Sequence, residues 1–437
     1  MDFKQDVIII GAGQAGLAAS YFLHQKGIQH CVLEQHTIGS SWSTQRWDSF
    51  KMNTPNWMTW LPGLKLQEKI RDQFMTKDSF TDYLKLYVNT FQLPIKEHCK
   101  VMSIHDEGSR FIITAERGGY CSEWSAKAVI IASGMMNRSR FPELSENVPQ
   151  DILQLHASEY KNPGQLPDGN ILVVGGGQSG CQIAEELAVS GRNVYLASSK
   201  VPRAPRRYRG KDIMEWMELI GSHDITASQL KEKPELGATQ PQSSGVGLLG
   251  HTVSYQSLHH LGVTILGSLK YIGNGGLFQL GVSVLGSMED TENRSLCFAD
   301  NAKEHIRFAD EASTSIKKAI DAYLKHQSGA ISMPPVEHDE ADIPDEHFHA
   351  ASGIHKLAFD SDHISTIIWA TGFGSDFTYL PDSWLDTSGI PRHTEGKIKD
   401  GVYCLGFPWV RKKKSGLVYG AGEDAEMIVK NILDGLK

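Results

Sequence analysis

The chain has 437 residues, of which 40% are hydrophobic and 22% are charged, so it is long enough for about two to three globular domains. Its 43 basic residues are outnumbered by 51 acidic ones, and the net charge of −8 argues against nucleic acid or an anionic membrane as a partner. No apolar stretch reaches the roughly 20 residues that a membrane span needs, and the N-terminus lacks the pattern of a secretory signal. The six cysteines are far apart in the sequence, which favours reduced thiols over a zinc site. We therefore expect a cytoplasmic protein without a metal ion.

An internal repeat comes first in chain order. Residues 7–34 align with residues 171–198 without a gap, and each copy has an apolar strand, a glycine-rich turn, a helix and a second strand. This pattern predicts a βαβ unit whose turn lets backbone amides approach the pyrophosphate of a dinucleotide. The residues predicted to form the two turns are Gly11, Gly13, Gln14, Ala15 and Gly16 in the first copy and Gly175, Gly177, Gln178, Ser179 and Gly180 in the second.

The two copies differ at the end of the second strand. The first copy has Glu34, followed by Gln35, and a carboxylate at this position accepts hydrogen bonds from the ribose hydroxyls of an adenosine. The second copy has Ser198 and then a basic run, which suits the 2′-phosphate of NADPH because phosphate needs charged donors. The residues predicted to bind that phosphate are Ser198, Lys200, Arg203, Arg206 and Arg207. We therefore predict FAD in the first copy and NADPH in the second, with a solvated basic loop as the alternative for the run.

A weaker duplication relates residues 128–134 to residues 366–372, each an apolar strand that ends in small residues. It places Gly134, Thr371 and Gly372 at the nucleotide edge of a parallel sheet. The predicted fold class is α/β, with two Rossmann-like dinucleotide-binding domains and the second inserted into the first. Residues 1–165 and 373–437 form the predicted FAD-binding domain, and residues 166–372 form the NADPH-binding domain with an inserted segment. Residues 233–250 are predicted to be a loop.

Several segments together carry a family resemblance. They are GAGQAG (11–16), GSSW (39–42), WDSFKMNTPN (47–56), LHASEYKNP (155–163), GGGQSG (175–180) and WATGF (369–373). In this order they resemble the class B flavin-dependent monooxygenases, which include N- and S-oxygenases, plant auxin-forming enzymes and Baeyer–Villiger enzymes. The linker motif before the second glycine turn departs from that of the Baeyer–Villiger enzymes at Gln150 and Ile152.

The resemblance implies roles for further residues. Trp42 would lie in the FAD loop, Arg46 and Trp47 would lie near the isoalloxazine, and Asn53 would be the active-site amide. An amide can donate a hydrogen bond to a peroxide oxygen without supplying a labile proton. The alternative for Asn53 is a turn residue before Thr54 and Pro55. His156, in the linker, would coordinate the domains.

The reaction that the resemblance implies is the reduction of FAD by NADPH, followed by formation of a flavin C4a-hydroperoxide with dioxygen. One oxygen atom would then pass to a small N- or S-containing, indole or carbonyl substrate. The cysteine spacing argues against a dithiol centre. Two alternatives stay open, namely an NADPH-dependent flavin oxidase or quinone reductase, and a non-catalytic redox sensor that binds FAD and NADPH.

Overall fold

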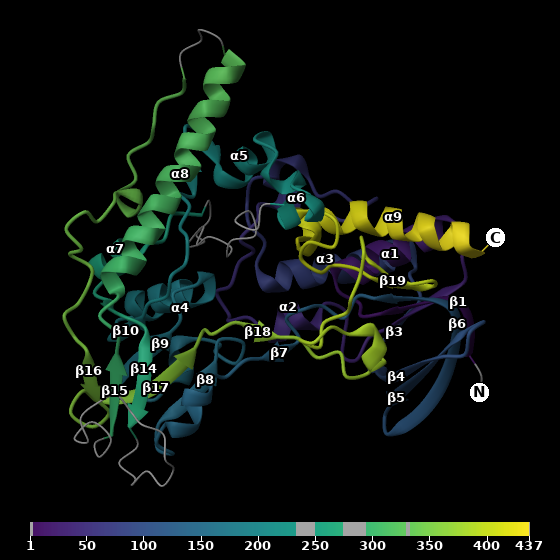
Figure 1. Cartoon of the computed structure of the whole chain (residues 1–437), viewed down its shortest axis with the longest axis horizontal. Coiled ribbons are helices and arrows are strands. Elements are labelled where there is room, and N and C mark those ends of the chain that lie inside the picture. Colours follow the sequence, from purple (N-terminus) through teal and green to yellow (C-terminus); the bar gives the residue numbers. More distant parts are fainter. Residues whose placement is uncertain (1–2, 233–249, 274–293, 329–332, 437) are drawn as a thin grey trace.

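The computed structural model describes residues 3–232, 250–273, 294–328 and 333–436. Residues 233–249, which form almost all of the predicted 233–250 loop, lie outside these ranges. One mainly parallel sheet occupies the end of the molecule that holds both termini, and a second parallel sheet occupies the other end (Figure 1). The predicted fold class, α/β with paired Rossmann-like units, is confirmed.

The first sheet has the strand order β19-β20-β6-β1-β2-β3, and β5 joins β4 to β6. Its strands are β1 (Phe3–Ile10), β2 (His30–Leu33), β3 (Ile95–Lys96), β4 (Lys100–Asp106), β5 (Phe111–Arg117), β6 (Tyr120–Ile131), β19 (Lys397–Lys399) and β20 (Val402–Cys404). The central strand β1 pairs in parallel with both β2 and β6. Its second half, Val7–Ile10, is buried, as expected for a strand that is covered on both faces.

The second sheet has the strand order β13-β10-β9-β17-β8, and neighbouring strands in this order pair in parallel. Its strands are β8 (Leu153–His156), β9 (Asn170–Val174), β10 (Val194–Ala197), β13 (Thr264–Leu266) and β17 (Ile364–Trp369). Three smaller sheets are antiparallel. They consist of β14 (Leu269–Gly273), β15 (Ser295–Phe298) and β16 (Lys356–Ala358); of β7 (Arg138–Ser139) and β18 (Phe373–Gly374); and of β11 (Arg207–Tyr208) and β12 (Lys211–Asp212).

Some helices pack against the parallel sheets, and others, such as the long helix that ends at Ser328, extend away from them (Figure 1). The helices are α1 (Gln14–Gln25), α2 (Ser40–Thr44), α3 (Lys77–Phe91), α4 (Gln178–Val189), α5 (Ile213–Leu219), α6 (Ala227–Glu232), α7 (Tyr255–His260), α8 (Ala302–Ser328) and α9 (Val418–Leu436). The C-terminal helix α9 lies beside α1 over the first sheet (Figure 1). None of the helices in the described ranges combines the length and the low charge that a membrane span requires.

The chain enters the second sheet earlier than the predicted boundary after residue 165. Strand β8 precedes residue 165, yet it pairs with β17 at the edge of the second sheet. The second unit therefore begins by residue 153, because an edge strand at Leu153–His156 completes its sheet. After β18 the chain returns to the first sheet, where β20 pairs in parallel with β6.

Candidate functional site

The turn after β1 can be formed only with glycine at two positions. Gly11 has φ +102°, and a Cβ atom there would lie 2.6 Å from the carbonyl oxygen of Ala132, at the end of β6. A Cβ at Gly16 would lie 2.0 Å from the carbonyl oxygen of Gly11. Both distances are shorter than a van der Waals contact, so the glycines allow α1 to start directly against the sheet.

The turn after β9 repeats this geometry in the second unit. Gly175 has φ +116°, and a Cβ there would lie 2.5 Å from the carbonyl oxygen of Ala370, at the end of β17. A Cβ at Gly180 would lie 1.9 Å from the carbonyl oxygen of Gly175. The repeat in the sequence is therefore a repeat of the same steric constraint at the same place in two sheets.

The N-termini of α1 and α4 have the same character. Their N-cap residues are Gly13 and Gly177, neither end has a side-chain cap, and neither first turn contains an acidic residue. A Cβ atom at Gly13 or at Gly177 would meet no atom within 4 Å. An uncapped helix N-terminus without an acidic residue places the positive end of the helix dipole at the turn, which is the arrangement that binds a pyrophosphate.

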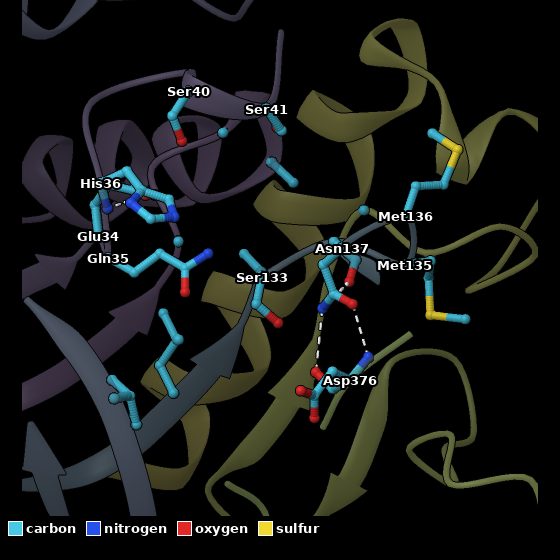
Figure 2. A pocket seen from close by; sticks show the side chains of 18 of the residues that line it. Glu34, Gln35, His36, Ser40, Ser41, Ser133, Met135, Met136, Asn137 and Asp376 are labelled. Atoms are coloured by element: carbon cyan, nitrogen blue, oxygen red, sulfur yellow. Dashed lines mark hydrogen bonds between the residues drawn. The ribbon is translucent and has the colours of Figure 1, made fainter. Parts of the chain in front are cut away.

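A cavity of about 510 Å³ extends from the first glycine turn. One end of the cavity is formed by residues that follow β2, and the other by residues that follow β6 together with Asp376 (Figure 2). Of the residues predicted from the sequence, those that line it are Gly11, Gly13, Gln14, Ala15, Glu34, Gln35, Trp42, Arg46 and Gly134. A glycine turn, a carboxylate and an elongated cavity in one place fit the size and the chemistry of FAD.

Glu34 is buried at the end of β2, and two backbone amides hold its carboxylate. The amide of Ala12 donates to Oε2 across 2.8 Å, and the amide of His36 donates to Oε1 across 2.8 Å. Since a carboxylate oxygen accepts more than one hydrogen bond, Glu34 can hold the turn and still accept from a ribose hydroxyl.

Arg46 brings a cation to the cavity. Its guanidinium lies 5.2 Å from the ring centre of Trp42 and 5.4 Å from that of Phe50, and it donates to the carbonyl of Gln45. Within the described residues no carboxylate pairs with it, and desolvation lowers its pKa to about 10. A cation in these surroundings favours an anionic ligand such as a reduced flavin. Trp47 is buried against Phe50 and does not line the cavity.

Asn53 lies between the two dinucleotide units rather than in the cavity wall. Its side-chain oxygen accepts from Nε2 of Gln182 on α4 across 3.2 Å. Another residue of α4, Glu186, accepts hydrogen bonds from Ser49 and Tyr160 at 2.6 and 2.7 Å. One side of the second unit's first helix therefore contacts the segment that runs from Arg46 to Asn53.

The structure divides the predicted phosphate-binding residues. Lys200 is exposed and pairs with Glu304 at 3.1 Å, and Arg207 is partly exposed on β11. Arg203, in contrast, is fully buried between Asp310, at 2.6 Å, and Asp342. Arg203 was predicted to bind the phosphate, and this prediction is wrong for the structure because two buried carboxylates occupy its guanidinium.

Two more members of that set also have internal partners. Ser198 is buried, and its hydroxyl donates to the carbonyl of Leu266 and contacts Nδ1 of His305 at 2.8 Å. Arg206 is 1% exposed and pairs with Asp212. The sequence could not separate these roles, because the acidic partners of the arginines lie up to 139 residues away. Lys200 and Arg207 are the members of the set that reach the surface.

The linker residues lie where the chain passes between the two units. His156 is buried, its Nε2 lies 2.9 Å from the carbonyl oxygen of Gly372, and its Nδ1 lies 2.8 Å from the hydroxyl of Ser158. Desolvation lowers its pKa, so the ring is neutral at pH 7. Thr371 donates to the carbonyl of Arg140 at 2.6 Å. His156 ends β8 and Gly372 follows the adjacent strand β17 of the second sheet, so these contacts order the segments through which the chain enters and leaves that unit.

Sequence reasoning missed a second group of cavity residues. They include His36, Ser40, Ser41, Lys100, Met135, Asn137, Asp376, Tyr379 and Gly406. Asn137 donates to the carbonyl of Asp376 at 3.1 Å and accepts from its amide at 2.7 Å (Figure 2). The serine pair beside Trp42 was one available signal, whereas the other residues come from segments far apart in the sequence that the tertiary fold brings together.

All six cysteines lie in the described ranges, and each is a free thiol. Cys31 and Cys99 belong to one buried cluster beside the Glu34 end of the cavity. Burial raises the pKa of Cys31 to about 12 and also raises that of Cys99. Thiols in this state are protonated and poorly reactive, so the fold gives no support to a dithiol centre.

The two glycine turns have the geometry of dinucleotide-binding turns built on one repeat. A comparison of the sequence with known families leads to the same conclusion. A profile of the family described as pyridine nucleotide-disulphide oxidoreductase matches residues 8–226, which is half of the chain and includes both glycine turns. The chain belongs to the pyridine nucleotide-disulphide oxidoreductase family.

The chain is also similar to individual proteins. It is 29% identical to an uncharacterized oxidoreductase CzcO-like of Geobacillus kaustophilus, over 98% of each chain. It is also 29% identical to the probable indole-3-pyruvate monooxygenase YUCCA10 of Arabidopsis thaliana, over 48% of this chain and 54% of the relative. A mutant of the flavin monooxygenase from Stenotrophomonas maltophilia has the same fold, with a TM-score of 0.62 at 18% identity and full coverage of both chains.

These findings establish the general class of enzyme to which the chain belongs. The chain is an oxidoreductase, and its resemblance to flavin-dependent monooxygenases is confirmed. FAD and NADPH are confirmed as its cofactors at the level of the family.

Proposed function

We propose that the chain is an NADPH- and FAD-dependent monooxygenase. Its overall reaction converts NADPH, a proton, dioxygen and a small nucleophilic substrate into NADP⁺, water and the oxygenated substrate. The oxygen donor would be a C4a-hydroperoxide of the bound FAD, and the substrate would offer a nitrogen, a sulfur, or an indole or carbonyl group. When bound, FAD supplies both the hydride acceptor and the oxygen activation.

The observation that carries the proposal is the position of Asn53 between the two units. The side-chain oxygen of Asn53 accepts from Gln182, while the side-chain nitrogen donates to no residue of the described ranges. The amide thus keeps its donor group for a ligand at the junction, where the nicotinamide and the isoalloxazine must meet for hydride transfer. A neutral donor at that point stabilises an oxygen atom without supplying an acidic proton.

Other residues of the site would hold the cofactors. The amides that follow Gly11 and Gly175 would bind the two pyrophosphates, and Glu34 would accept from the FAD ribose. Lys200 and Arg207 would bind the 2′-phosphate of NADPH. Arg46 would balance negative charge on the reduced flavin from within an aromatic surrounding.

The family name leaves disulfide reduction as a competing function. The protonated, buried thiols of Cys31 and Cys99 argue against it. The competitor that stays is an oxidase or quinone reductase, because it would use the same two sites. A non-catalytic redox sensor would also bind both dinucleotides.

Rapid mixing of the FAD-loaded protein distinguishes these functions. The protein is reduced with NADPH without oxygen and is then mixed with oxygenated buffer while flavin absorbance is followed. We expect a transient flavin–oxygen adduct, and NADPH consumption that is coupled to product with an amine, sulfide or indole substrate. Direct return to oxidised flavin would indicate an oxidase, and absence of reduction by NADPH would indicate a sensor.

A further inference from the structure

Arg206 belongs to the basic loop that follows β10, but its surroundings are those of an interior residue. It is 1% exposed, and a loop cation that binds a phosphate must be reachable by that phosphate. We propose that Arg206 is a positioning residue for Asn53, so that the second dinucleotide unit fixes the active-site amide of the first. The proposal rests on the function proposed above for Asn53.

The guanidinium of Arg206 is held on several sides. Nη1 donates to the backbone carbonyl of Asn53 across 2.9 Å. Nε donates to Oδ2 of Asp212 across 2.8 Å, and Nη2 lies 2.6 Å from the same oxygen. Its carbon Cζ lies 4.4 Å from the ring centre of Phe74. An added Cβ at Gly250 would lie 3.2 Å from Nε, so the peptide at this glycine closes the site.

The backbone carbonyl that Arg206 contacts belongs to a segment, residues 52–56, that hydrogen bonds hold at both ends. The amide of Met52 donates to Met75 at 2.8 Å, and the amide of Asn56 donates to Gln73 at 2.9 Å. Phe74 stands between these two acceptors, so Arg206 covers both the segment of Asn53 and the segment that pairs with it. Holding the backbone carbonyl of Asn53 therefore also fixes the direction of the Asn53 side chain.

Both oxygen atoms of Asn53 are held by the second unit. The backbone oxygen accepts from Arg206, and the side-chain oxygen accepts from Gln182 on α4. The donor end of the amide is then aimed by residues that lie on the NADPH-binding side. A shift of α4 or of the loop after β10 would move the amide, which links occupancy of the second site to the geometry of the first.

Phosphate binding is the competing role for Arg206. A 2′-phosphate would have to displace Asp212 and the carbonyl of Asn53 from a buried guanidinium, and it would leave that carboxylate and that carbonyl without a donor. The loop offers Lys200 and Arg207 nearer to solvent for this purpose.

The test compares Arg206→Lys with Arg209→Lys in the FAD-loaded protein. Arg209 lies in the same loop and also pairs with an aspartate, since its Nε is 2.7 Å from Asp321, but the structure records no contact between it and Asn53. Hydrogen exchange of the amides in residues 52–56 is measured, together with the dissociation constants of NADP⁺ and NAD⁺ and the fraction of consumed NADPH that appears as peroxide.

We expect exchange in residues 52–56 to rise about tenfold or more in Arg206→Lys, because one ammonium group does not replace the separate guanidinium donors to Asp212 and to the carbonyl of Asn53. Exchange in Arg209→Lys stays as in the parent protein, and the ratio of the two dissociation constants changes less than about twofold in Arg206→Lys, since no phosphate contact is lost. Peroxide release rises only in Arg206→Lys.

Unchanged exchange in residues 52–56, or a loss of affinity about tenfold greater for NADP⁺ than for NAD⁺, would overturn the proposal. If Arg206→Lys does not fold, Asp212→Asn replaces it. This variant keeps an oxygen for the amide of Met214, and it must raise exchange in the same residues for the proposal to stand. A parent protein that never oxygenates a substrate would refute the proposed function, whereas the exchange and affinity results would still judge the contact.

Discussion

The amide of Ala12 donates to the carboxylate of Glu34 across 2.8 Å, which ties the first glycine turn to the end of the neighbouring strand β2. The second oxygen of Glu34 accepts from His36, so the carboxylate is oriented before any cofactor arrives. A preorganised acceptor loses less entropy on binding than a free side chain does. The pair therefore serves both the shape of the turn and the affinity for the adenosine end of FAD.

Replacing this carboxylate tests that dual role. We predict that Glu34→Gln raises the dissociation constant for FAD about tenfold or more, because the amide group presents one acceptor where the carboxylate presents two. The control is Glu97→Gln, which alters a carboxylate that accepts from the amide of Ile38 but does not line the cavity. The measurement is flavin fluorescence during titration of the apoprotein, and equal effects of both variants would contradict a direct role of Glu34.

Arg203 is predicted to matter for stability rather than for cofactor choice. Arg203→Met leaves Asp310 and Asp342 buried without their guanidinium partner, and breaking such a pair costs about 3–5 kcal/mol. Burial by itself would raise the pKa of Asp342, but Arg203 and the hydrogen bonds from Lys317 and Ser313 lower it overall. Urea unfolding checks the prediction. A variant of parental stability with a selectively weakened affinity for NADPH would return Arg203 to the phosphate site.

Lys200 is predicted to select NADPH over NADH. Lys200→Ala should raise the KM for NADPH about tenfold while leaving the KM for NADH nearly unchanged, because only NADPH carries the 2′-phosphate. Lys303→Ala, an exposed lysine at the start of α8, controls for the loss of one positive charge. Steady-state kinetics with both nucleotides decide the matter, and equal changes for NADPH and NADH would remove Lys200 from the phosphate site.

The amide nitrogen of Asn53 is predicted to be the group that matters for coupling. Asn53→Asp keeps an oxygen for Gln182 but loses the donor, so flavin binding and hydride transfer should persist while oxygenation is replaced by peroxide release. The matched change is Gln182→Glu, which keeps the Asn53 amide group but removes the donor that orients it. Peroxide is measured against NADPH consumed, and full coupling in Asn53→Asp would contradict the catalytic role.

An ionic contact between the two units is predicted to depend on pH. Asp224, beside α5, contacts Lys412 and Lys414 at 2.9 Å each, and the hydrogen bonds from these lysines lower its pKa. A lowered folded pKa gives stability that is present above the unfolded value of about 3.9 and is lost as the pH falls through the folded value. Asp224→Asn should therefore lower the melting temperature at pH 7 and have no effect once the carboxyl is protonated.

Because Asp224 is half exposed, we expect the effect at pH 7 to correspond to no more than about 1 kcal/mol. High salt should reduce it further. Melting curves of both proteins at a series of pH values provide the test. A difference that grows toward acid pH would show that the sign of the coupling is wrong.

Much of the architecture was predictable because it depends on local steric rules. Gly11 and Gly175 adopt positive φ angles and lie against the ends of neighbouring strands, and only glycine satisfies both conditions. The sequence shows such positions directly, since their spacing within the strand–turn–helix pattern is short. For the same reason Glu34, one residue beyond a buried strand, was found at the end of the cavity.

The roles of the basic residues could not be derived in the same way. The pattern of Lys200, Arg203 and Arg206 looks like one basic patch, yet the fold exposes the first and buries the other two. A cation's role depends on the carboxylates that reach it, and those of Arg203 come from residues 310 and 342. The sequence by itself determined the two dinucleotide turns through short-range sterics. Only the tertiary structure decided which cations are buried and which reach the surface, because long-range ion pairing and burial set the cost of exposing each charge.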